Sequence, residues 1–304
     1  MTRAVVFAYH NVGVRCLKVL LSAGVEVPLV VTHRDNPSEL IWFDSVAAVC
    51  EDHGIPYITP DDPNTGEVLA QLQSASPDFL FSFYYRHMLK APLLDAVPRG
   101  AYNLHGSLLP RYRGRVPINW AIIRGETETG ATLHVMNVKP DNGAIVDQCA
   151  VPILIDDTAG EVFGKVVVAA EIVLARSLPK LIDGTASFRP QVLSDGAYFG
   201  GRKAEDGRIP ADAGAKAVHD LVRALAPPYP GAFIDLRGRR IVIERTRLID
   251  APPSALPGQP LRLAADGDAL QFFCADGCSL QVLAATMDGQ PLTAARLRML
   301  STDN

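Results

Sequence analysis

Asn103 and His105 are the two residues whose types and spacing best suit chemistry. They end an apolar run, and the alternation of a strand puts both side chains on one face, at the carboxyl end where open α/β sheets place ligands. Asp141 follows in a Pro-Asp-Asn-Gly turn. If the three converge, they suit acyl transfer to an amine: Asn donates to an oxyanion, His moves the proton and Asp orients the imidazole. On residue types alone, a structural role for such a His and Asn is the commoner outcome.

Other kinds of catalytic site have weaker support. A Ser or Cys nucleophile is not needed when the acyl group arrives activated, and the G-x-S-x-G elbow of hydrolases does not occur around Ser107. Cys274 and Cys278 lack a second pair of ligands, so ordinary packing is favoured over a zinc site and no metal is expected.

The composition predicts a globular protein of one large or two medium domains, since 48% of the 304 residues are hydrophobic. The net charge of −4 and the pI of about 6.0 argue against a general nucleic-acid or anionic-membrane binder. The first apolar run is too short for a signal peptide or a membrane span. The five cysteines are odd in number and scattered, which indicates reduced thiols and a cytoplasmic location.

The elements that must position Asn103 and His105 alternate between strands and helices. Apolar runs predict strands at 4–8, 27–31, 54–58, 79–83 and 101–104, and helical spacing predicts helices at 12–21, 43–52 and 68–73. Further strands at 132–138 and 144–150 and a helix at 159–181 follow. This order predicts an α/β fold with a Rossmann-like, mostly parallel sheet joined by right-handed crossovers.

The turn after the first strand contains only one glycine, Gly13, and lacks the G-x-G-x-x-G spacing of a dinucleotide site. A nicotinamide cofactor is therefore not expected. His10 and Asn11 lie at the carboxyl end of this strand. Lining of a substrate cleft and capping of the next helix both suit this position, and for Asn11 capping is at least as well supported.

A glycine-rich, charged stretch divides the chain. We predict a catalytic domain at 1–193, a linker at 194–210 and a second domain at 211–304. The second domain has a predicted helix at 215–226 and short predicted strands at 232–235, 240–248, 261–263, 270–274 and 280–284. Short strands at regular spacing are typical of a small barrel, here an OB-like β-barrel.

The run from Asn103 to Gly114, N-L-H-G-S-L-L-P-R-Y-R-G, with Pro117, Trp120 and the later Asp141-Asn-Gly, resembles the signature of the 10-formyltetrahydrofolate-dependent formyltransferases. Segments 5–10, 32–37, 81–87 and 125–130 are similar to the formyltransferase domain of the bifunctional ArnA enzyme, which formylates UDP-4-amino-4-deoxy-L-arabinose. The resemblance covers essentially the whole chain and is weaker in the barrel. At Ile209-Pro-Ala211 the chain departs from the acidic or aromatic residues that relatives carry.

The resemblance implies roles for the site residues. Asn103 stabilises the transition state, His105 shuttles the proton and Asp141 raises the pKa of His105. The implied folate site consists of Arg115, of Asn137, Val138, Lys139, Pro140 and Asp141, and of a wall at 83–88 that includes Tyr85 and Met88.

The acceptor site is less defined. Guanidinium groups bind phosphate oxygens in pairs, so Arg111 and Arg113 are candidates for a sugar-nucleotide pyrophosphate, although a solvated loop face suits either arginine equally. Arg202 matches an F-G-R-type segment of the family and is a third candidate, and His10 is a fourth.

The implied reaction transfers a formyl group from 10-formyltetrahydrofolate to the 4-amino group of a UDP-amino sugar, as in the lipid A modification that gives polymyxin resistance. A small sugar nucleotide and folate are then the partners, with no nucleic acid and no membrane. Methionyl-tRNA formyltransferase is an alternative, disfavoured by the acidic charge and by the lack of a basic insertion within 9–35. Two other acceptors stay possible, another amino sugar and a siderophore amine. A protein that only binds or hydrolyses formyl-folate is a further alternative, and the sequence does not fix the oligomeric state.

Overall fold

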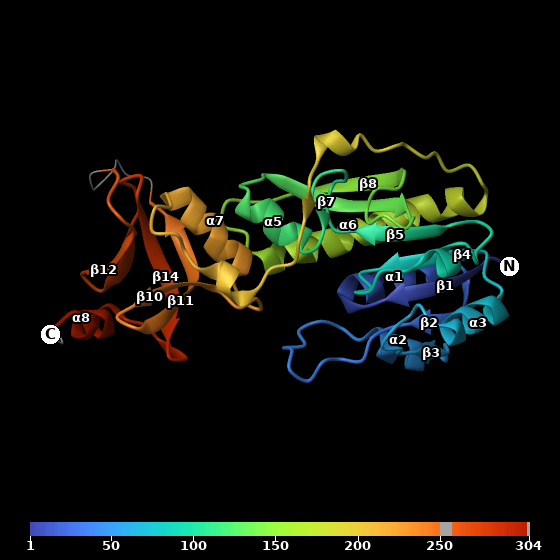
Figure 1. The fold of residues 1–304 in the computed structure, drawn as a ribbon, viewed down its shortest axis with the longest axis horizontal. Helices are drawn as coiled ribbons and strands as arrows, with labels where there is room; N and C mark the ends of the chain where they lie inside the picture. The colour runs from blue at the N-terminus through green and yellow to red at the C-terminus, as the bar shows by residue number, and fades with distance from the viewer. Residues whose placement is uncertain (250–256, 303–304) are drawn as a thin grey trace. The chain divides into compact units, whose positions relative to one another are not determined.

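The computed structural model describes residues 1–249 and 257–302, which form two compact units (Figure 1). The first unit comprises Met1–Pro117, Glu128–Val151 and Gly164–Gly200. The second comprises Ile118–Thr127, Pro152–Phe163 and Gly201–Asn304.

A seven-stranded sheet in the order β3-β2-β1-β4-β5-β7-β8 forms the centre of the first unit. Its strands are β1 (Arg3–Ala8), β2 (Glu26–Val31), β3 (Tyr57–Ile58), β4 (Phe79–Phe83), β5 (Ala101–His105), β7 (Glu128–Val135) and β8 (Ile145–Pro152). The five strands from β3 to β5 are parallel, and β7 pairs antiparallel with β5. The parallel strands therefore end at one edge of the sheet, which is where polar loop residues can gather.

Helices cover both faces of this sheet. They are α1 (His10–Ser22), α2 (Val46–His53), α3 (Gly66–Ala75), α4 (Ala91–Leu94) and the part of α6 (Ala159–Ile182) after Phe163. The helix α5 (Pro117–Ile123) belongs to the second unit from Ile118 onward. On one face Phe7 and Leu80 pack with Leu72 of α3 and Leu93 of α4. Strand side chains alternate between faces, and Ala8 accordingly lies on the other face beside α1 and α2. Burial on both faces explains why β1 and β4 are continuous apolar runs.

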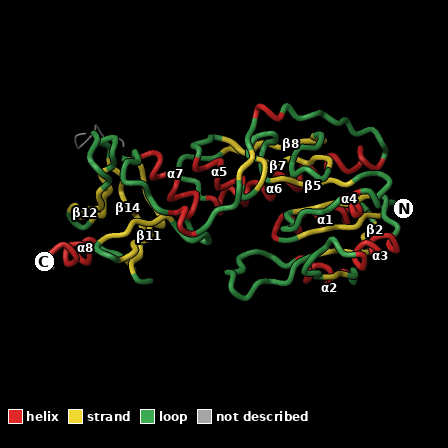
Figure 2. Tube along the Cα trace, in the orientation of Figure 1, coloured by secondary structure: helices red, strands yellow, loops and turns green. Residues whose placement is uncertain are grey.

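Two connections shape the edge of the sheet. The chain between β2 and α2, residues 32–45, forms neither helix nor strand (Figure 2). The segment that follows β5 contains the short strand β6 (Arg113–Gly114), which pairs with β9 (Tyr198–Phe199). The 3-10 turns Leu193–Asp195 and Ala204–Gly207 flank β9.

The second unit is an antiparallel sheet in the order β10-β11-β14-β13-β12, with β15 on β14. Its elements are α7 (Ala215–Leu225), β10 (Ala232–Leu236), β11 (Arg239–Leu248), β12 (Arg262–Asp266), β13 (Ala269–Phe273), β14 (Ser279–Met287), β15 (Gln290–Pro291) and α8 (Ala294–Thr302). Val218, Val222 and Leu225 lie on one side of α7 and pack against Ile243 and Phe272 of the sheet.

The predicted fold class is confirmed: a mostly parallel α/β sheet is followed by an antiparallel C-terminal half-barrel. Some boundaries were wrong. The helix predicted at 43–52 begins only at Val46, because the Ser45 hydroxyl caps it by accepting from the amide of Ala48. The strand predicted at 132–138 is β7, which begins at Glu128 and ends at Val135. The short helices α4, α5 and α8 were not predicted.

Candidate active site

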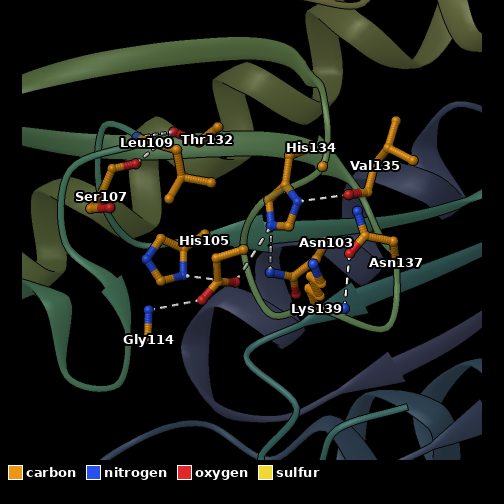
Figure 3. A network of polar contacts seen from close by, with 12 residues as sticks. Asn103, His105, Ser107, Leu109, Gly114, Thr132, His134, Val135, Asn137 and Lys139 are labelled. Carbon is orange, nitrogen blue, oxygen red and sulfur yellow. Dashed lines mark hydrogen bonds and ion pairs between the residues drawn. The ribbon is translucent and has the colours of Figure 1, made fainter. Parts of the chain in front are cut away.

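Asn103 lies on β5 directly opposite His134 of the antiparallel strand β7. The Nδ2 of Asn103 is 3.1 Å from the Nε2 of His134, and the Nδ1 of His134 is 2.9 Å from the carbonyl oxygen of Val135 (Figure 3). A carbonyl oxygen only accepts, so Nδ1 carries the proton and Nε2 of the neutral ring accepts from the Asn103 amide. This contact fixes the orientation of the amide and leaves its second N–H to donate elsewhere.

His105 is the last residue of β5 and is only 7% exposed. Its Nε2 is 2.9 Å from the carbonyl oxygen of Tyr112, and its Nδ1 is 3.5 Å from Oδ1 of Asp141. Both neighbours are acceptors. The ring can therefore carry two protons without leaving an N–H unpaired.

Asp141 is held in the turn between β7 and β8 with a left-handed backbone, at a φ of 54°. Its Oδ2 accepts from the amide of Gly114 at 2.9 Å, and its Oδ1 lies 3.6 Å from Nε2 of His134. Burial acts to raise the pKa of the Asp141 carboxyl, but a protonated His105 and the hydrogen bond from the Gly114 amide act against it, and that pKa lies well below its usual range. Asp141 is therefore a carboxylate that faces both imidazoles.

A buried polar network supports the loop that carries the Tyr112 carbonyl. The Ser107 hydroxyl donates to the carbonyl oxygen of Arg111 at 2.6 Å. The Thr132 hydroxyl donates to the Ser107 carbonyl at 2.6 Å and accepts from the amides of Leu109 and Gln148. Ser107 and Thr132 are fully buried. The loop is thus fixed to β7, and with it the acceptor that faces Nε2 of His105.

The residues assigned to folate surround the same turn. Asn137, Val138, Lys139 and Pro140 connect β7 to Asp141, and the Asn137 side chain accepts from the Lys139 amide at 2.9 Å. Val138 is 62% exposed. An exposed apolar side chain beside backbone amides and carbonyls suits a flat heterocycle with a polar edge. The buried Oδ1 of Asn142 has no hydrogen-bond partner among the described residues, so it is a further acceptor beside Asp141.

The other predicted folate residues lie on two segments. Tyr85 follows β4 and stacks on His33 at a ring distance of 4.1 Å, with its hydroxyl buried. Met88 on the same segment is 54% exposed. Arg115 has an exposed side chain, and its amide donates to the Phe199 carbonyl at 2.9 Å. Binding of folate by these residues stays a prediction.

Three of the four predicted acceptor residues lie in the first unit. The His10 ring stacks on Phe43 at 3.9 Å, and burial lowers its pKa to about 4, with Arg86 adding to the effect. Arg113 donates to the carbonyl oxygens of Leu193 and Gly196, both at 3.1 Å. Arg111 lies 4.0 Å from Glu128.

Arg202 belongs to the second unit, where its guanidinium lies over the ring of Trp120 at 4.7 Å. It also donates to the Asp206 carbonyl at 2.6 Å. Burial lowers its pKa below the usual value for arginine. Substrate binding by Arg111, Arg113 and Arg202 stays a prediction.

Four residues of the site were not predicted from the sequence: Ser107, Gly114, Thr132 and His134. A weak signal existed for His134, because the alternation in 132–138 puts Thr132 and His134 on one face of the strand. Their proximity to Asn103 depends on the antiparallel pairing of β5 with β7. The sequence pattern does not specify that pairing.

Within residues 1–249 and 257–302, no group of three or more His, Cys, Asp or Glu side chains is placed to hold a metal ion. None of the helices described there is long and apolar enough to cross a lipid bilayer.

Comparison with protein families gives two matches. Residues 8–178 match the family model described as formyl transferase, and residues 202–298 match the one described as formyl transferase, C-terminal domain. Together these matches include Asn103, His105, His134 and Asp141.

Several solved structures share the fold. An N-formyltransferase from Helicobacter canadensis, in complex with folinic acid and dTDP-3-aminofucose, has a TM-score of 0.74 at 19% identity and covers 96% of this chain and 100% of its own. A sugar N-formyltransferase from a Shewanella species has a TM-score of 0.65 at 20% identity over 80% of this chain and 97% of its own. HypX from Aquifex aeolicus, in complex with tetrahydrofolic acid, has a TM-score of 0.65 at 16% identity over 99% of this chain and 48% of its own.

Proposed function

The chain belongs to the formyl transferase family, and from this premise we propose that it transfers a formyl group from 10-formyltetrahydrofolate to the 4-amino group of a UDP-linked amino sugar. The observation that carries the proposal is the contact chain Asn103–His134–Asp141–His105 at the carboxyl end of β5. It combines an oriented amide donor with a buried imidazole that has an acceptor at each nitrogen. UDP-4-amino-4-deoxy-L-arabinose is the proposed substrate, by the resemblance of segments 5–10, 32–37, 81–87 and 125–130 to the ArnA domain.

Each residue has a distinct part in this reaction. Bound 10-formyltetrahydrofolate supplies the formyl group. The second Nδ2–H of Asn103 donates to the formyl oxygen as negative charge develops there. His105 receives a proton that the attacking amine loses and, once protonated, is held by the Tyr112 carbonyl and Asp141. His105 returns this proton to N10 of the folate as the bond between N10 and the formyl carbon breaks, which releases tetrahydrofolate. The Asp141 carboxylate is ionised at neutral pH, because its pKa lies well below the usual range.

The folate and sugar-nucleotide assignments have support from relatives of the same fold. The Helicobacter canadensis structure contains folinic acid and dTDP-3-aminofucose, and the HypX structure contains tetrahydrofolic acid. In this chain, the turn from Asn137 to Asp141, with exposed Val138, fits a pteridine edge. A role in lipid A modification follows only if the arabinose sugar is the acceptor.

The test measures tetrahydrofolate release from 10-formyltetrahydrofolate, with mass spectrometry of the acceptor. The acceptors are UDP-4-amino-4-deoxy-L-arabinose, a dTDP-amino sugar and methionyl-tRNA, beside a sample without acceptor. We expect release to depend on the UDP-amino sugar and the sugar to gain one formyl group. Release that ignores every acceptor indicates a formyl-folate hydrolase, and formylation of the tRNA alone indicates the other branch of the family. Either result overturns the proposal.

A further inference from the structure

A cavity of about 330 Å³ lies at the other side of the same sheet edge, away from the catalytic residues. Residues that follow β1, β2 and β3 line it, together with the start of α2. Its volume is at the lower end of the range of roughly 300–1,000 Å³ for small-molecule sites. It therefore suits a nucleoside and not a whole sugar nucleotide. All the lining residues belong to the first unit.

The cavity contains one carboxylate, Asp35, which lies just after β2. Its Oδ1 accepts from the Tyr9 hydroxyl at 2.7 Å. Burial of Tyr9 and the adjacent carboxylate raise the pKa of that hydroxyl, so Tyr9 stays a donor to Asp35. The carboxylate has more lone pairs than this one bond uses. In Rossmann domains that bind NAD, an acidic residue near the end of the second strand accepts from the ribose 2′-hydroxyl.

The rest of the lining supplies donors. Arg34 donates through Nε to the Thr59 hydroxyl at 3.1 Å, which leaves its Nη groups to face a phosphate. The His33 Nε2 accepts from the Arg86 amide at 3.1 Å, so the ring proton is on Nδ1. Burial lowers the pKa of His33 to about 4, with His87 and Arg86 adding to the effect, and the ring is neutral at physiological pH. A neutral donor suits a base carbonyl or a phosphate oxygen.

The distance to the catalytic residues fits a sugar nucleotide. In the sheet order, β1 and β4 separate β2 from β5, so the two strands are three spacings apart, about 14 Å. An extended diphosphate and pyranose span such a length. A nucleoside in the cavity thus places the amine of the sugar near His105, at the end of β5.

On the proposed function as premise, we infer that this cavity binds the nucleoside of the acceptor and that Asp35 selects a ribonucleotide by accepting from the 2′-hydroxyl. The residue thereby determines specificity for UDP- over dTDP-linked sugars. This selection distinguishes the chain from the relative solved with dTDP-3-aminofucose.

Calorimetric binding of UDP and dUDP tests the inference, since these ligands differ only in the 2′-hydroxyl. We expect the whole chain to bind UDP about tenfold more tightly than dUDP. This factor corresponds to the lower end of the range for a hydrogen bond to a charged group, and we use the lower end because Asp35 is exposed. Asp35→Asn should reduce the preference to within about twofold, by loss of affinity for UDP. Asp44→Asn is the matched control, because it makes the same change on the same segment at a residue that does not line the cavity.

Three results overturn the inference: no binding of UDP, equal affinities for UDP and dUDP, or a preference that survives Asp35→Asn. An unchanged circular dichroism spectrum and melting temperature show that the variant is folded. Formyl transfer to the UDP-amino sugar is measured in parallel with the wild-type chain. If formyl transfer occurs but UDP is not preferred over dUDP, only this inference is overturned. If UDP is preferred through Asp35 but no formyl transfer occurs, only the proposed function is overturned.

Discussion

Asn103 and His134 face each other across the antiparallel pair β5 and β7, with 3.1 Å between Nδ2 of the amide and Nε2 of the imidazole. The Val135 carbonyl holds the proton of His134 on Nδ1. As a result, His134 presents a lone pair to Asn103 and orients the N–H that stabilises the oxyanion in the proposed reaction. His134 is thus a positioning residue that acts through Asn103.

Replacement of His134 by Phe should lower kcat about tenfold, because the Asn103 amide loses one hydrogen bond and can rotate. KM for both substrates should change less than twofold, since His134 is 2% exposed and is not assigned to either substrate. His134→Gln restores an acceptor and should recover part of the loss. Steady-state kinetics measure the split. A variant that changes KM alone would show that His134 binds substrate instead.

His105→Gln should lower kcat by a factor of about 10²–10⁴, the usual contribution of general acid–base catalysis. The glutamine cannot carry the extra proton, although it can still donate to the Tyr112 carbonyl. His53→Gln is the control, as His53 is exposed in the last turn of α2. Single-turnover formyl transfer at saturating substrates measures the effect. Equal activity of the two variants would exclude His105 as the proton carrier.

Most of the fold was predictable because its elements are buried on both faces or alternate strictly. The run from Phe79 to Phe83 matches β4 residue for residue, since a strand covered by helices on both sides must be apolar throughout. The short helices α5 and α8 have few turns and weak periodicity, so tertiary packing determines them more than pattern does.

The site was predictable only in part. Asn103 and His105 alternate along one strand, a local relationship that the sequence displays. Gly114 and His134 join them through pairings between distant segments, β6 with β9 and β5 with β7. Strand partners are set by the whole sheet, and no local spacing reveals them. The role of the Tyr112 carbonyl could not be predicted from the sequence either, because every residue has a backbone carbonyl oxygen.

Asp141→Asn should lower stability at neutral pH by on the order of 2 kcal/mol, since a charged partner of buried groups is lost. The pKa of Asp141 is lower in the folded chain than in the unfolded one, so the folded state binds fewer protons and stability falls as the pH decreases. The difference from wild type should be constant between about pH 7 and 5 and shrink below about pH 4, the unfolded pKa.

Urea unfolding of both proteins at each pH measures this difference. Asp52→Asn, at an exposed position on α2, is the control. The interpretation fails if the stability difference between wild type and Asp141→Asn grows as the pH falls, because a group of lowered pKa cannot give that sign.

Gly114→Ala should reduce kcat at least tenfold, roughly the effect of one lost hydrogen bond to a charged group. Gly114 has a φ of 101°, and a Cβ there would lie 2.2 Å from the carbonyl oxygen of Phe199. The substitution must push β6 away from β9, which moves the Gly114 amide off Oδ2 of Asp141. Gly184→Ala is the matched control, because its φ of 72° imposes a similar backbone strain with no atom within 4 Å of the added methyl. Kinetics and thermal unfolding of both variants separate the two effects: we expect both to lose stability and only Gly114→Ala to lose turnover. A similar loss of turnover in both variants would trace it to backbone strain and remove the Gly114 amide from the proposed mechanism.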